Sequence, residues 1–111
     1  MPTDDRVLIE SPFAGDVQKN LRYVRACMAD CFHKGESPYA PHALYTQDGV
    51  LNNNIPEERK AGVEAGRTWG DAADIIAIYT DLGISSEMKA AISYYEKEGT
   101  PIEYRTVPDW K

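Results

Sequence analysis

The fold is decided by residues 75–95, which read IIAIYTDLGISSEMKAAISYY. The β-branched run at 75–79 is typical of a strand that is buried on both faces. A turn with Gly83 follows it, and then a helix begins near Ser85 with one apolar face, made by Met88, Ile92 and Tyr95. A strand, a glycine turn and a serine-capped helix are how α/β folds present backbone N–H groups to a ligand. This stretch therefore predicts a parallel sheet and a binding site where the helix begins.

The rest of the chain supplies further strands and helices in alternation. Strands are expected at 7–9, 37–40 and 102–107, and helices at 16–34 and 56–74. Asp16 can cap the first helix, Pro56 suits the first turn of the second, and 41–55 reads as a long binding loop. With no hairpin signal, this order predicts an α/β, three-layer, Rossmann-like (flavodoxin-like) parallel sheet of four to five strands flanked by helices. Residues 1–111 are expected to form one domain, with a frayed lead-in at 1–5.

Composition and charge exclude several classes of protein. A net charge of −6 argues against a nucleic-acid polymer as partner, since such partners require basic patches. No apolar run is long enough to span a membrane, and no secretory signal is visible. Cys27 and Cys31 are expected to be core thiols, neither a disulfide pair nor a zinc site, which indicates a cytoplasmic protein. No metal-ligand motif has the right spacing, so we expect no metal and no cofactor.

In a parallel sheet, ligands bind at the carboxyl ends of the strands, where three loops are expected to converge: 11–16, 41–45 and 80–86. In the first loop, Ser11 suits a hydrogen bond to a sugar and Phe13 suits stacking on a base, although a turn serine and a core phenylalanine would look the same. In the second, His42 titrates in the range used for acid–base chemistry and Tyr45 can stack on a base. Either residue can equally be structural.

The third loop and the first helix add further candidates. Asp81 can accept a sugar hydroxyl or can simply form a turn. Ser85 and Ser86 can cap the helix and still leave free N–H groups for a 5′ oxygen. Asp16 is first a helix cap, and Asn20 lies one turn further on the same face. The candidate ligand-binding residues are therefore Ser11, Phe13, Asp16, Asn20, His42, Tyr45, Gly83, Ser85, Ser86 and Met88.

Four groups of motifs recur in a characteristic order: Ser11-Pro12-Phe13 with Asp16 and Asn20; Ala40-Pro41-His42 with Leu44-Tyr45; Glu58-Arg59 with Gly62, Gly66 and Ala73-Asp74; and Gly83-Ile84-Ser85 with Met88, Ile92 and Gly99-Thr100-Pro101. Together they cover most of the chain. In order and spacing they resemble the nucleoside 2-deoxyribosyltransferase superfamily, and more narrowly the small deoxyribosyltransferase-like proteins of phages and bacteria.

This resemblance implies cleavage of the N-glycosidic bond between a (deoxy)ribose and its base. In such enzymes a glutamate attacks the anomeric carbon, and the sugar passes to water or to another base, with the physics of a retaining glycosidase. The resemblance also implies that the first loop shapes the sugar and base pocket, and that the serine turn lies near the 5′ hydroxyl or phosphate. A homo-oligomer with shared active sites is implied as well.

The chain departs from the family pattern at the catalytic position. The family helix reads G-x-x-x-E-I-x-x-A, and alignment on Ile92 places Ala91 at the nucleophilic glutamate and Glu87 at the glycine. Either the protein is a natural binding variant, or an engineered Glu→Ala substitution is present. Glu87 lies one helical turn earlier, displaced by about 6 Å. It is a substitute nucleophile or only a complement to the helix dipole.

Three hypotheses follow. The first is an N-glycosidase or deoxyribosyltransferase acting on nucleosides or nucleotides, with Ala91, Glu87 and Asp81 as the positions that bear on catalysis. The second is a non-catalytic protein that sequesters a nucleotide signal, for example in phage anti-defence. The third, a structural protein with no small ligand, is disfavoured by the expected convergence of the three loops.

Overall fold

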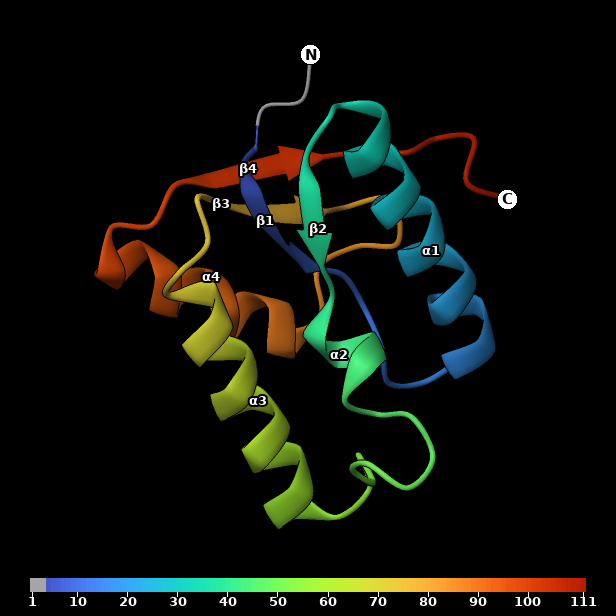
Figure 1. The fold of residues 1–111 in the computed structure, drawn as a ribbon. Helices are drawn as coiled ribbons and strands as arrows, with labels where there is room; N and C mark the ends of the chain where they lie inside the picture. The colour runs from blue at the N-terminus through green and yellow to red at the C-terminus, as the bar shows by residue number, and fades with distance from the viewer. Residues whose placement is uncertain (1–3) are drawn as a thin grey trace.

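The computed structural model describes residues 4–111 and shows a four-stranded parallel sheet that lies between α1 on one face and α4 on the other (Figure 1). The expected frayed lead-in falls mostly on residues 1–3, outside the described range. In chain order the elements are β1 (Arg6–Glu10), α1 (Val17–His33), β2 (Ser37–Tyr39), α2 (Pro41–Leu44), α3 (Pro56–Gly70), β3 (Ile75–Tyr79), α4 (Ser86–Glu98) and β4 (Ile102–Arg105). No helix within the described residues is long and apolar enough to cross a membrane.

The strands lie in the order β2-β1-β3-β4, and every neighbouring pair is parallel. This is the order in which flavodoxin-like sheets begin, so the α/β prediction is confirmed, with four strands. The central pair runs from Val7 opposite Ile75 to Glu10 opposite Ile78. The strand order reverses between β1 and β3, and ligands of open α/β sheets bind at the carboxyl end of such a reversal.

Side chains of β1 alternate between the two faces of the sheet, and each face has its own apolar core. Val7 and Ile9 face α1, whereas Leu8 faces α4. The core beneath α1 also includes Tyr23, Val24, Cys27, Cys31, Ala77 and Tyr79. The core beneath α4 is completed by Ile76, Ile78, Met88, Ala91 and Tyr95. The run at 75–79 is therefore buried from both sides, and both cysteines are buried free thiols, as the sequence predicts.

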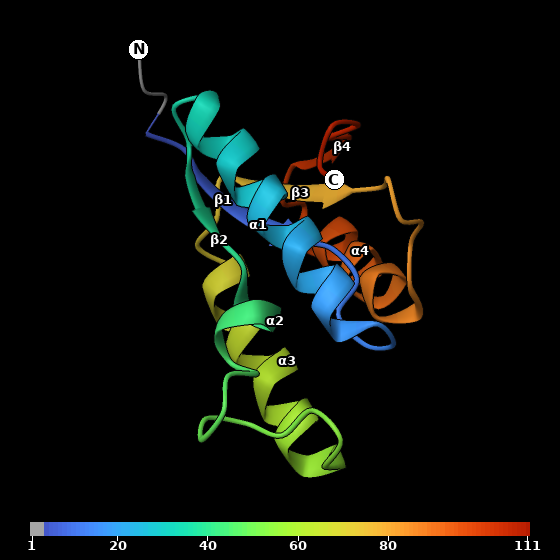
Figure 2. The same ribbon diagram turned by 90° about the vertical axis from the view of Figure 1, so that its right-hand side faces the viewer.

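The segment 41–44 corrects one prediction, because it forms helix α2 and not the start of a long loop. Proline has a fixed φ that suits a first helical turn, and Pro41 occupies that position. The N–H groups of Ala43 and Leu44 both donate to the Ala40 carbonyl, at 3.1 Å. The loop between helices is therefore confined to residues 45–55, and α2 and α3 lie side by side below the sheet (Figure 2).

Two other elements end earlier than the sequence suggests. Helix α3 ends at Gly70 and not near Asp74, because Asp74 is bonded to the sheet: its N–H donates to the Arg6 carbonyl at 2.8 Å, and its carboxylate accepts the Arg6 N–H at 2.7 Å. Strand β4 ends at Arg105, before the expected end at Val107. The Val107 N–H donates to a carboxylate in the loop after β3 and so leaves the ladder.

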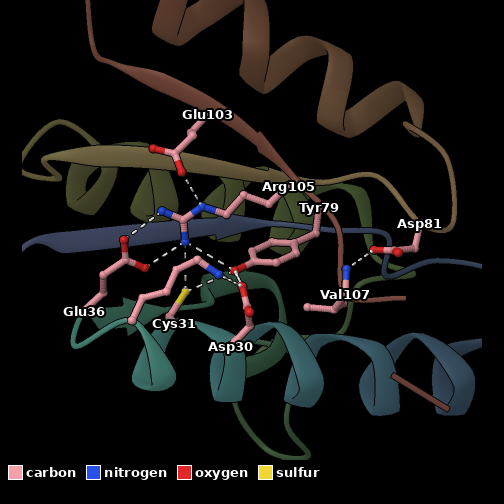
Figure 3. A network of polar contacts seen from close by, with 9 residues as sticks. Asp30, Cys31, Glu36, Tyr79, Asp81, Glu103, Arg105 and Val107 are labelled. Atoms are coloured by element: carbon pink, nitrogen blue, oxygen red, sulfur yellow. Dashed lines mark hydrogen bonds and ion pairs between the residues drawn. The ribbon is translucent and has the colours of Figure 1, made fainter. Parts of the chain in front are cut away.

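A buried ion pair crosses the face of the sheet that α1 covers (Figure 3). The Arg105 guanidinium donates two hydrogen bonds of 2.8 Å to the Glu36 carboxylate and one of 2.9 Å from Nε to Glu103. The Tyr79 hydroxyl accepts from Arg105 at 3.3 Å and donates to Asp30 at 2.8 Å. Because the side chains of Arg105 and Glu36 are only 5% and 7% exposed, water cannot replace either partner. The pair fastens β4 to the segment that enters β2.

Replacing Glu36 by alanine should lower the free energy of unfolding by about 3–5 kcal/mol, because the Arg105 charge would stay buried without its bidentate partner. Urea denaturation measures the change. The control is Lys60→Ala, which removes an exposed pair 3.9 Å from Glu64 and should change stability by less than about 0.5 kcal/mol. Equal effects of the two substitutions would contradict this account of the pair.

Candidate functional site: a pocket between α2, α3 and α4

The structure encloses a cavity of about 130 Å³ beyond the carboxyl end of β1, on the face of the sheet that carries α4. Its walls come from the end of β1 and the turn after it, from α2, from one face of α3 and from the first turns of α4. A wider hollow of about 700 Å³ lies around the loop at 46–54. It shares with the cavity the residues Phe13, Ala14, Thr46, Leu51, Asn53 and Glu58. The site therefore has an inner recess and an outer mouth.

Glycines allow the helices around the cavity to approach one another closely. Gly66 of α3 packs against Pro41 of α2, where an added Cβ would lie 3.4 Å from the proline ring. At Gly70 the hydroxyl end of the Tyr95 ring occupies the space of a side chain, so no larger residue fits there without a shift. These two glycines are also the only buried residues of α3. They set the spacing of α3 from α2 and α4, and thereby the width of the cavity.

The N-terminus of α4 forms one wall of the cavity. The Ser85 hydroxyl caps the helix by accepting the Met88 N–H at 3.2 Å. Ser85, Glu87, Met88 and Ala91 then follow along the cavity wall. Ala91 is only 4% exposed and presents a methyl group to the space in which a glutamate at that position would lie.

Ser11 and His42 meet at a second wall. The Ser11 hydroxyl and His42 Nε2 share a hydrogen bond of 2.8 Å. Burial lowers the pKa of His42 to about 4, so its imidazole is neutral at pH 7. Among residues 4–111 no carboxylate bonds the other ring nitrogen, so the pair lacks the third group that orients a catalytic histidine. The pair is suited to hydrogen-bonding a ligand.

Aromatic and apolar side chains complete the outer part of the recess. Phe13 and Tyr45 line it together with Leu51 and Val63. The Tyr45 hydroxyl is hydrogen-bonded to the Tyr39 hydroxyl at 2.6 Å, which fixes its ring in the cavity wall. Such surfaces suit the flat face of a heterocycle.

Glu10, which the sequence analysis passed over, lies in the cavity wall. As the last residue of β1 it projects to the same face as Leu8, toward α4. Within residues 4–111 its carboxylate has no hydrogen-bond partner. No fully enclosed side-chain oxygen in that range lacks a partner, so the Glu10 oxygens must reach the open space of the cavity. Burial raises the pKa of Glu10 to about 7, although the nearby Arg67 opposes this shift.

Helix α3 contributes a charged stripe that the sequence analysis also left without a role. Glu58, Arg59 and Arg67 line the cavity, and the Arg67 guanidinium lies 4.6 Å from the centre of the Tyr94 ring. Glu58-Arg59 with Gly62 and Gly66 is one of the quoted motifs, and the spacing of three to four residues places them on one helix face. For Glu10, the feature of the sequence that could have indicated a site residue is its position as a charged residue at the end of an apolar strand.

Five of the predicted site residues lie outside the cavity wall. The carboxylate of Asp81 accepts the Tyr23 hydroxyl at 2.6 Å and the Val107 N–H at 2.9 Å, so it fastens the loop after β3 to α1 and to the C-terminal tail. The remaining four are Asp16, Asn20, Gly83 and Ser86.

Of these four, Asn20 acts on the pocket indirectly. Its side-chain amide donates to the Phe13 and Ala14 carbonyls at 2.9 and 3.0 Å, and so holds the turn that carries Phe13. Asp16 caps α1 by accepting the Lys19 N–H at 3.2 Å. Within residues 4–111 no group of three His, Cys, Asp or Glu side chains is placed to hold a metal ion.

Comparison with protein-family models shows one match, to the family described as Domain of unknown function (DUF7768), over residues 5–105. The matched range contains all four strands and every wall of the cavity. Neither the curated proteins nor the solved structures contain a significant match to the chain.

The Glu10→Gln variant should be more stable than the wild-type chain at high pH only. The folded-state pKa of Glu10 is about 7, above the ordinary value of 4.5. Between these two pH values the folded chain therefore binds more protons than the unfolded chain. Glu10 consequently lowers the free energy of unfolding as pH rises through this window. Glu10→Gln lacks this loss. Its free energy of unfolding should exceed that of wild type by up to about 3 kcal/mol at pH 8, but by little at pH 4.5.

Urea denaturation of both proteins at the two pH values measures this gain. The His42 titration has the opposite slope, because its pKa is lowered, but it is common to both proteins and cancels in the difference. Glu87→Gln, at an exposed carboxylate on the cavity rim, is the control and should give a difference below about 0.5 kcal/mol. A Glu10→Gln variant less stable than wild type at pH 8 would disprove the burial of Glu10.

Proposed function

We propose that this chain, which belongs to the family Domain of unknown function (DUF7768), binds a nucleoside or nucleotide in the cavity and cleaves its N-glycosidic bond, as a hydrolase or a deoxyribosyltransferase. One observation supports this most: the turn after β1 and the first turns of α4 line the same cavity, with position 91 in its wall. The resemblance to the nucleoside 2-deoxyribosyltransferase superfamily requires this arrangement, because its nucleophile at that position must face the sugar.

The chemistry of the walls suits the two halves of a nucleoside. Ser11, His42 and Ser85 supply hydrogen-bonding groups near the end of β1 and the start of α4, on the side proposed for the sugar. Phe13 and Tyr45 supply aromatic faces toward the mouth, where a base would stack. A small recess with convergent polar groups and an apolar mouth is the usual form of a small-molecule site.

Both nucleosides and nucleotides remain within the proposal. Glu87 lines the cavity beside the proposed 5′ end and would repel a phosphate. Arg59 and Arg67 line the same cavity and supply compensating positive charge. The carboxylates and guanidinium groups of the walls therefore permit either ligand.

A non-catalytic nucleotide-binding protein is the second candidate, and Ala91 is the observation that favours it. A buried methyl group cannot attack an anomeric carbon, whereas the remaining walls would still hold a ligand. Sequestration of a nucleotide signal, as in phage anti-defence, is a function that needs binding alone.

The proposal includes a homo-oligomer in the cytoplasm. Helix α3 buries only its two glycines, and its apolar Val63 and Trp69 are 42% and 57% exposed, which supports a neighbouring copy against this helix. Two free thiols support a reducing compartment.

Sedimentation equilibrium should show a dimer or larger species, and Trp69→Glu should weaken this association. A monomer at all concentrations would count against the shared site.

An Ala91→Glu variant tests the catalytic proposal directly. It should release free base from at least one member of a panel of nucleosides and deoxynucleoside monophosphates, because it restores a carboxylate at the family position. Chromatography of the free base measures the rate. Ala90→Glu, the same change at an exposed neighbour, is the control and should add no release beyond that of the wild-type chain.

Base release by the wild-type chain, by Ala91→Glu or by both supports the enzyme. Tight binding of a panel member by both forms without release supports the second candidate. Neither release nor binding contradicts both.

A further inference from the structure

Glu10 is a carboxylate that the fold itself aims into the recess. It closes an otherwise apolar strand at the edge where the strand order reverses, and the pleat of β1 directs it toward α4. Its oxygens have no partner among residues 4–111, and they border the same cavity as Ala91. The positive charge of Arg67 on α3 lowers the pKa of Glu10, and the negative charge of Glu10 raises the pKa of Tyr95 on α4. All three residues line the cavity.

The charge of Glu10 does not stabilise the fold, because its desolvation outweighs the attraction of Arg67. A half-buried carboxylate without hydrogen bonds destabilises the folded state, and a glutamine or an apolar residue would pack at the end of β1 at lower cost. A titratable group held in a cleft against its own desolvation cost is typical of a functional site. The same desolvation makes its ionised form a strong partner for positive charge that develops on a ligand.

We propose that Glu10 is the nucleophile of this chain and takes over the role that Ala91 cannot perform. This proposal rests on the proposed N-glycosidic activity. A Glu10 carboxylate oxygen bonds to the anomeric carbon as the bond from that carbon to the base nitrogen breaks. The bonding electron pair leaves with the base, which takes a proton from solvent. Water then attacks the anomeric carbon, loses a proton to solvent and releases Glu10 as the carboxylate, so that nucleoside and water give free sugar and free base.

Three other groups in the cavity are less suited to this step. Glu87 is exposed at the rim, and its carboxylate accepts the Ser86 hydroxyl at 3.2 Å. Glu58 is half-buried in the wall, but its carboxylate accepts the Asn52 N–H at 2.9 Å. Ser11 has a neutral histidine beside it, but a hydroxyl offers no negative charge to an oxocarbenium-like sugar.

The proposal specifies a pH dependence. The charged and titratable groups that share the cavity with Glu10 are Glu58, Arg59 and Arg67 on α3, Glu87 and Tyr95 on α4, and His42 and Tyr45 near α2. Burial keeps Tyr95 and His42 neutral across the neutral range, because it raises the pKa of the first and lowers that of the second to about 4. Since the nucleophile must be ionised, base release should rise with pH through about 7, following the pKa of Glu10.

The experiment compares wild type, Glu10→Gln, Glu96→Gln and Ala91→Glu on the nucleoside and nucleotide panel. Wild type should release base, and Glu10→Gln should lose on the order of 1,000-fold in rate. Glu96→Gln, at an exposed carboxylate of α4 outside the cavity wall, is the control and should stay within about threefold. Incubation with 2′-deoxy-2′-fluoroarabinosyl adenine, whose fluorine slows hydrolysis of a glycosyl ester, should leave a covalent sugar on the Glu10 peptide in mass spectrometry. A melting temperature of Glu10→Gln no lower than that of wild type, together with unchanged adenosine binding, shows that the variant is folded.

The outcomes separate this proposal from the activity on which it rests. Base release by Glu10→Gln at the wild-type rate overturns the role of Glu10 and leaves the N-glycosidase in place. Release by Ala91→Glu but not by wild type does the same, as does a covalent sugar found on Glu87. No release by any of the four proteins contradicts both.

Discussion

Parallel pairing of β1 with β3 at the centre of the sheet is the constraint on which the rest of the structure depends. It aligns the carboxyl ends of two buried strands, from Val7 opposite Ile75 to Glu10 opposite Ile78, and sends the following segments to opposite faces. One face is closed by α1, whereas on the other a cavity remains beyond β1, between the end of that strand, α2, α3 and the first turns of α4. The cavity thus lies where the strand order places it, and Ala91 is part of its wall.

The fold was largely predictable because its signals are local and strong. The β-branched run at 75–79, the caps at Asp16 and Ser85 and the absence of a hairpin turn leave little other than a parallel α/β sheet. Two element boundaries were predicted wrongly. Asp74 leaves α3 because it bonds to Arg6 of the sheet, a tertiary contact that spacing along the chain does not reveal. The segment after Pro41 is closed into a helical turn by local bonds to the Ala40 carbonyl, where the sequence suggested a loop.

The site was predictable only in outline. Loops that follow parallel strands meet at one edge, so Ser11, His42 and Ser85 were expected together and line one cavity. Asp81 follows a strand equally closely, but a tyrosine on α1 and the C-terminal tail draw its carboxylate away, which no local pattern reveals. Glu10 was passed over because a single charge ending a strand usually marks the strand's exposed edge, and only the pleat and the neighbouring helices enclose it.

We propose that the turn after β1 and the start of α4 are two walls of one site for a ribose-bearing molecule. Titration of ¹⁵N-labelled protein with adenosine and its 5′-monophosphate, followed by amide chemical shifts, tests it most directly. The account predicts saturable shifts at residues 10–13, 42–46 and 85–91, with little change in α1. Shifts confined to other surfaces, or none with any nucleoside or nucleotide, would contradict it.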